Sequence, residues 1–61
     1  MRKTQAYEKA ADHLNRCAAD LRRAYAARGK ARGELEHSAG RELEEALLLI
    51  NKVADAERAK P

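Results

Sequence analysis

The sequence has little of what builds a thick protein interior. Among its 61 residues there is no tryptophan and no phenylalanine, and two tyrosines are the only aromatic residues. Fourteen residues are alanine, so a side chain of one methyl group supplies much of the 44% hydrophobic content. Burial at roughly 25 cal/mol per Å² of apolar area then offsets little of the conformational entropy lost on folding. We therefore expect one small domain that needs a partner to be stable.

The chain also lacks long apolar runs and paired cysteines. Its longest run of consecutive apolar residues is Ala46 to Ile50, whereas a bilayer-spanning helix needs roughly 20 such residues. The basic residues at the start are not followed by the apolar stretch of a signal peptide. Cys17 has no second cysteine with which to form a disulfide. These features predict a cytoplasmic protein without a membrane partner.

Apolar and small residues recur at helical spacing in both halves of the chain. In the first half the pattern comprises Tyr7, Ala10, Ala11, Leu14, Cys17, Ala18, Leu21, Ala24 and Tyr25. In the second half it comprises Ala39, Gly40, Leu43, Ala46, Leu47, Ile50, Val53 and Ala54. Each set keeps to one face of an α-helix and fills the a, d and g positions of a heptad. The patterns predict an all-α protein.

Two glycines mark the point where the chain turns back. Gly29 and Gly33 interrupt a sequence that otherwise favours helix, and Gly29 suits a left-handed residue at a helix end. We predict helix one over about 4–28, a turn over 29–33 and helix two over about 34–59, within a single domain 1–61. The fold class is an antiparallel, coiled-coil-like two-helix hairpin with arms of equal length. Glu34 and Glu36 would lie in the first turn of helix two, where the helix dipole favours anions.

A different start for the second helix is the alternative. The segment His37-Ser38-Ala39-Gly40 could break the helix, and Ser38 would then be its first capping residue. Three residues after Ser38 stands Arg41 rather than the Glu or Gln of a capping box. The start near 34 is therefore favoured over the start at 38.

Folding the chain about this turn predicts a register between the helices. If facing residue numbers add up to 61, a positions meet d positions, and a large residue meets a small one in four of five layers. The pairs are Tyr7 with Ala54, Ala11 with Ile50, Leu14 with Leu47, Ala18 with Leu43, and Leu21 with Gly40. We therefore expect the a and d positions to lie between the two helices, and Gly40 to permit their close approach.

Other apolar residues remain for a protein interface. Leu47 to Ile50 covers almost a full helical circumference, so part of this run must point away from the predicted contact. We predict an interface made of Leu35, Leu48 and Leu49 together with the g-position residues Ala10, Cys17, Ala24, Ala46 and Val53. The partner would be a second copy, giving a homodimeric four-helix bundle, or another protein.

Basic residues form a line along the first half. Arg2, Lys9, Arg16 and Arg23 recur every seven residues, and Arg28, Lys30 and Arg32 extend the basic character into the turn. Such a line could contact the phosphates of nucleic acid. Both tyrosines belong to the apolar pattern, so no aromatic platform for stacking bases accompanies the basic residues.

Residues that could support catalysis or ligand binding are few. His13 and Cys17 stand four apart, but two such groups on one helix do not make a metal site or an activated nucleophile. We predict no catalytic, metal or cofactor site, no small-molecule substrate, and a protein that is not an enzyme. The predicted function is that of a protein–protein interaction module, such as a small adaptor, inhibitor or chaperone-like subunit. The alternative is a small nucleic-acid-binding regulator.

Overall fold

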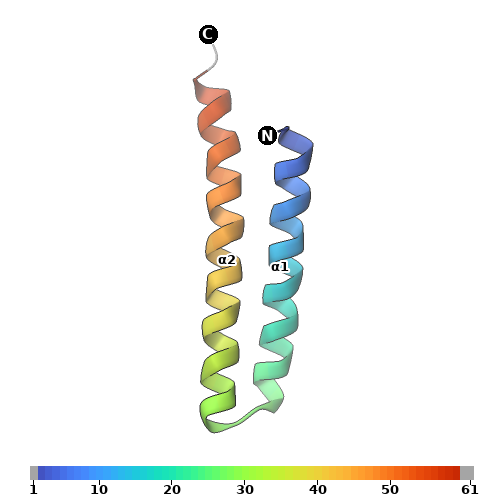
Figure 1. The fold of residues 1–61 in the computed structure, drawn as a ribbon, viewed down its shortest axis with the longest axis vertical. Helices are drawn as coiled ribbons and strands as arrows, with labels where there is room; N and C mark the ends of the chain where they lie inside the picture. Colours follow the sequence, from blue (N-terminus) through green and yellow to red (C-terminus); the bar gives the residue numbers. More distant parts are fainter. Residues whose placement is uncertain (1, 60–61) are drawn as a thin grey trace.

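The computed structural model describes residues 2–59, which form two long helices. They are α1 (Lys3–Ala26) and α2 (Gly29–Arg58). The helices lie side by side in opposite directions and are joined at one end (Figure 1). Within residues 2–59 there is no strand. The predicted all-α, antiparallel hairpin is therefore confirmed.

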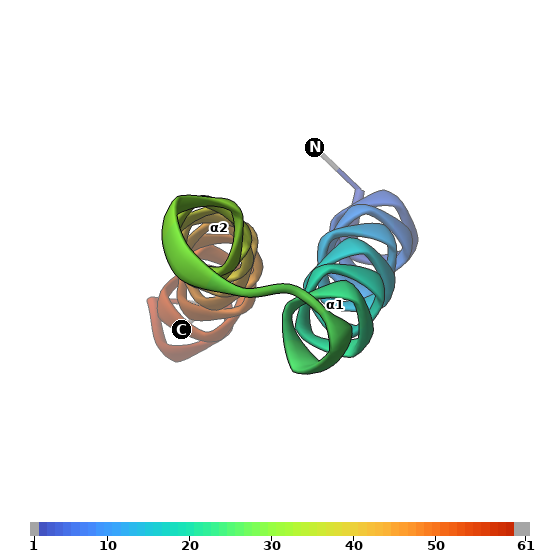
Figure 2. The ribbon, with the colours of Figure 1, turned by 90° about the horizontal axis from the view of Figure 1, so that it is seen from below.

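The hairpin is one helix thick. Its principal extents are 51 × 15 × 13 Å. Seen along its length, each helix has the other as a neighbour on one side and no helix on its remaining sides (Figure 2). A single pair of helices cannot enclose large side chains, so most of each helix surface stays open to solvent.

The connection between the helices is shorter than the predicted turn at 29–33. Ala27 and Arg28 form it, both in extended conformations. The Ala27 N–H closes α1 by donating to the carbonyls of Arg23 and Ala24 at 3.0 and 3.2 Å. Gly29 has a φ of +60°, which confirms the predicted left-handed residue, although it begins α2 rather than ending α1. The predicted turn is therefore wrong by several residues, and Gly33 lies inside α2.

Because α2 begins at Gly29, the predicted interaction of acidic residues with the dipole of its first turn is absent. Glu34 and Glu36 lie beyond the first turn of α2, which contains no acidic residue. They form i,i+4 ion pairs with Lys30 and Arg32, at 4.0 and 3.8 Å. The alternative start at Ser38 is wrong, because α2 continues through this residue.

The two arms differ in length, contrary to the prediction of equal arms. α1 has 24 residues and α2 has 30. The carboxyl end of α2 extends past the beginning of α1 (Figure 1). Near these free ends, Lys3 donates a hydrogen bond to Glu57, and this bond raises the pKa of Lys3.

The helices meet along a line of small residues, which we call the seam. Its fully buried members are all alanines: Ala6, Ala10, Ala24, Ala39 and Ala46. Half-buried residues at the same helical spacing are His13, Cys17, Asp20, Ala27, Leu35, Glu42, Leu49 and Val53. Steps of three and four residues connect these positions, so they follow one stripe on each helix. Short side chains along the seam allow the two backbones to approach closely.

The a and d positions do not form the contact between the helices. Leu14 and Leu47, expected to face each other inside the hairpin, are 42% and 50% exposed. Polar contacts across the hairpin join residues whose numbers add up to 55, 58, 58 and 60, rather than 61. Compared with the prediction, each helix is therefore rotated about its own axis, so that alanines face the other helix and the larger side chains face solvent.

Candidate protein interface

Eight large apolar side chains among residues 2–59 are exposed, and we call the seven of them other than Leu48 the apolar face. Their exposed fractions range from 41% to 92%. Tyr25, close to the connection, is the most exposed of them. The apolar face comprises Tyr7, Leu14, Leu21 and Tyr25 on α1 and Leu43, Leu47 and Ile50 on α2.

Both helices direct these residues to the same side of the hairpin. Each member of the apolar face follows a seam residue by one or four positions, as Leu21 follows Cys17 and Leu47 follows Ala46. An offset of one or four residues turns a side chain by roughly 40–100° from the seam, in the same rotational sense on both helices. Because the helices are antiparallel, this sense of rotation leads to one common side. The seven side chains therefore form a surface carried by both helices.

Gly40 lies within this surface. It is exposed, and a Cβ atom built on it would have no heavy atom of the hairpin within 4 Å outside its immediate helical neighbourhood. The expectation that Gly40 permits close approach of α1 is therefore wrong. A glycine inside a helix costs about 1 kcal/mol relative to alanine, and no contact within the hairpin compensates for this cost.

The residues predicted to contact another chain lie mostly inside the hairpin. Ala10, Ala24 and Ala46 are buried in the seam, so the prediction that they face a partner is corrected. Their small side chains are used where the two helices approach each other. Cys17, Val53, Leu35 and Leu49 are half-buried along the same seam.

Leu48 is the exception among the predicted interface residues. It is 56% exposed, but it precedes the seam residue Leu49 by one position and is therefore turned about 100° from the seam in the opposite sense to the apolar face. Leu48 lies on the outer side of α2, apart from the apolar face. A single exposed leucine of this kind is common on protein surfaces.

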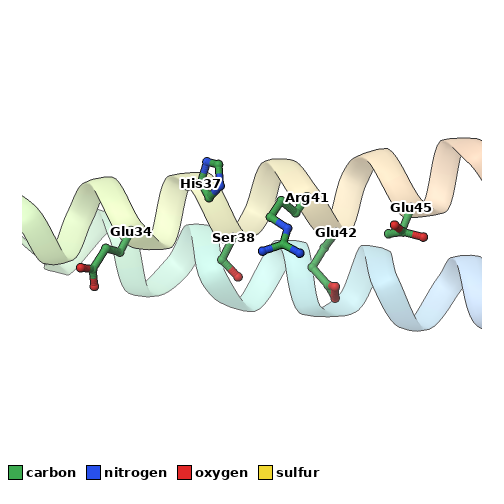
Figure 3. A pocket seen from close by; sticks show the side chains of 6 residues that line it. All are labelled: Glu34, His37, Ser38, Arg41, Glu42 and Glu45. Atoms are coloured by element: carbon green, nitrogen blue, oxygen red, sulfur yellow. The ribbon is translucent and has the colours of Figure 1, made fainter.

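The other side of the hairpin is polar and contains the polar contacts that join the middle parts of the two helices. Ser38 donates from Oγ to Oδ2 of Asp20 at 2.7 Å. Arg16 donates from Nη1 to Oε2 of Glu42 at 3.4 Å, and Nδ1 of His13 lies 3.3 Å from Oε1 of the same carboxylate. Figure 3 shows Ser38 and Glu42 directed toward α1, while His37 points away. These contacts lie on the edge of the seam opposite the apolar face.

Two shallow depressions accompany these polar contacts. They share Ser38 and Glu42 and are open to solvent. One is lined by Glu34, His37, Ser38, Arg41, Glu42 and Glu45 (Figure 3). The other is lined by Arg16, Ala19, Asp20, Arg23, Ser38 and Glu42. The mixture of acids and bases suits contacts between the helices and does not select one sign of ligand charge.

His13 and Glu42 are both half-buried and approach each other across the helices. Their pairing across the helices could not be found from a register in which facing numbers add up to 61. Among residues 2–59 no group of three His, Cys, Asp or Glu side chains is placed to hold a metal ion. Neither helix, over its described length, is long and apolar enough to cross a membrane.

The seven basic residues predicted to contact nucleic acid are all exposed. They run along α1, through the connection and into the start of α2: Arg2, Lys9, Arg16, Arg23, Arg28, Lys30 and Arg32. Three of them already have acidic neighbours, since Arg16 lies near Glu42 and the two basic residues of α2 form the i,i+4 pairs described above. The predicted line exists, but acids interrupt its positive charge.

In comparisons with known proteins, no protein-family model, no curated protein and no solved structure matches the chain.

Proposed function

We propose that the protein is a non-catalytic interaction module that binds another polypeptide through its apolar face. The observation that supports this proposal is the inverted placement of its side chains. The buried residues of the hairpin are all alanines, while Tyr7, Leu14 and Leu47 are among the large side chains left in solvent. Monomeric proteins rarely leave so much contiguous apolar surface uncovered.

The stability of the hairpin supports the same proposal. No large side chain among residues 2–59 is fully buried, and a domain of this size has a marginal core even when it is well packed. Covering the apolar face would remove from water the apolar area that the isolated hairpin leaves exposed. Binding of a partner to the folded state then stabilises that state.

Nucleic-acid binding is less well supported. The predicted basic residues share the polar side and the tip with Glu34, Glu36 and Glu42. A phosphate backbone placed there would meet these carboxylates as well as the basic groups. The exposed basic residues are therefore explained equally well by an ordinary solvated surface and by a nucleic-acid-binding surface.

Site-specific photocross-linking in living cells tests the interaction module. Benzoylphenylalanine is placed in one variant at Leu47 and in a matched control at Leu48, which is a neighbouring leucine of similar exposure on a different side of α2. We expect a discrete protein adduct from position 47 and none from position 48. Equal adduct formation at the two positions, or none at either, would contradict the proposal.

A further inference from the structure

We propose that the apolar face is covered by a second copy of this chain, with α1 of each copy lying against α2 of the other. The resulting assembly is a four-helix bundle with a two-fold axis along the hairpin and both connections at the same end. This inference rests on the proposed function and names the partner of the same surface.

The size of the apolar face fits such a dimer. Its seven side chains have exposed fractions of 41–92%. With about 150–200 Å² for each fully exposed side chain, this corresponds to on the order of 600 Å². Small residues between them, such as Ala11 and Ala54, add to the surface. Stable interfaces bury roughly 800 Å² per partner, so one further hairpin is sufficient to cover the face.

The charges of the two helices favour pairing of α1 with the partner's α2. α1 contains five Lys and Arg against three acids, so its formal net charge is +2. α2 contains five Lys and Arg against seven acids, so its formal net charge is −2. The proposed arrangement places helices of opposite charge together at both contacts. An arrangement with the connections at opposite ends places α1 on α1 and α2 on α2.

The connection ends come together in this dimer, and their charges are partly compensated. Lys30 and Arg32 each have a glutamate one turn further along α2, at 4.0 and 3.8 Å. These pairs reduce the positive charge that two neighbouring tips bring together. The remaining cations lie at the exposed end of the bundle, where solvent and salt screen them.

The side chains of the apolar face also complement each other in this arrangement. A two-fold axis along the hairpin keeps each residue at its own height, and facing a and d pairs whose numbers add up to 61 are then offset along the two copies by less than about one helical turn. A large residue then meets a small one, as Leu21 meets the partner's Gly40 and Ala11 meets the partner's Ile50. The pairing that fails inside the hairpin is thereby satisfied between copies, and Gly40 acquires a close neighbour.

Sedimentation equilibrium of the purified chain is the first test. We expect a dimer, with a dissociation constant that rises by at least about 100-fold in Leu47→Lys and by less than about threefold in Leu48→Lys. Circular dichroism of the variants at high protein concentration shows whether helix content is retained. A wild-type chain that stays monomeric overturns the second copy as partner. Cross-links from Leu47 to a different protein would in that case still support the interaction module.

Spin-label distances test the arrangement. In a Cys17→Ala background, Ala31→Cys places a label near the connection and Asn15→Cys places one near the middle of the hairpin. For adjacent connection ends we expect a distance below about 25 Å between the two labels at position 31, since packed helix axes are about 8–10 Å apart. Connections at opposite ends would separate these labels by on the order of 40 Å, from a rise of 1.5 Å per residue, and would overturn the proposed arrangement. The label at position 15 gives a short distance in both cases and shows that a labelled dimer has formed.

Discussion

The hydroxyl of Ser38 donates a hydrogen bond to the carboxylate of Asp20 at 2.7 Å, joining the middle of α2 to α1. This bond lies on the polar side of the seam, together with the contacts of Glu42. These polar contacts and the apolar face therefore lie on opposite sides of the hairpin. A substitution in the polar contacts therefore does not touch the apolar face, and a substitution in the apolar face does not touch the polar contacts.

The Ser38–Asp20 bond should contribute modestly to stability. Ser38→Ala leaves the carboxylate without this donor, and we expect the free energy of unfolding to fall by about 0.5–1 kcal/mol. Urea denaturation at fixed protein concentration measures the change. A double-mutant cycle with Asp20→Ala isolates the pair, and Asp12→Ala provides an exposed acid of the same helix as control. Additive effects of Ser38→Ala and Asp20→Ala would show that the bond does not stabilise the hairpin.

The seam should not accept a larger side chain. Ala46 is 1% exposed, and Ala46→Leu introduces three further carbon atoms where the helices approach each other. We expect a loss of about 1–3 kcal/mol in the free energy of unfolding. Ala56→Leu makes the same substitution at an exposed position of α2 and should change stability by less than about 0.5 kcal/mol. Equal melting behaviour of the two variants would contradict a seam built on alanine.

The number of helices and the approximate place of the chain reversal could be predicted from the sequence. Apolar residues spaced three and four apart predict helices, and a glycine at position 29 predicts a left-handed residue near the reversal. The structure has this residue at a φ of +60°. The length of the connection could not be predicted, because Gly33 is as able to end a helix as to lie within one. The continuation of α2 through Ser38, by contrast, agrees with the start near 34 that the sequence favours over a start at 38.

The side of each helix that faces its neighbour could not be predicted from hydrophobicity. The apolar pattern is wide enough for two contacts, and hydrophobicity predicts that the larger side chains lie in the contact between the two helices. The hairpin uses the smaller side chains inside, and the seam also contains His13, Asp20 and Glu42, which do not stand out in an apolar pattern. The apolar face is recognised once the exposure of residues such as Leu14 and Leu47 is known.

The two glycines at the start of α2 should respond to alanine in opposite ways. Gly33 lies within the helix with open space around a Cβ atom, so Gly33→Ala should raise the free energy of unfolding by up to about 1 kcal/mol. Gly29 has a φ of +60°, and Gly29→Ala should lower it by roughly 1–2 kcal/mol because an L residue is strained there. Thermal denaturation of both variants, followed by circular dichroism, measures the difference. Stabilisation by Gly29→Ala would contradict the left-handed conformation.

Gly40→Ala separates the properties of the hairpin from those of the proposed dimer. Within the hairpin, the added methyl group meets no other part of the chain and improves helix propensity, so the monomer should gain about 1 kcal/mol. In the dimer, the same methyl group enters the contact with the partner's Leu21, and overpacking of such a site costs about 1–3 kcal/mol. Because each dimer contains two of these contacts, we expect the free energy of association to weaken by roughly 2–6 kcal/mol. Circular dichroism at low micromolar concentration and sedimentation equilibrium over a range of concentrations measure the two effects separately. Tighter association together with higher helix content would show that no side chain of a second copy packs against Gly40.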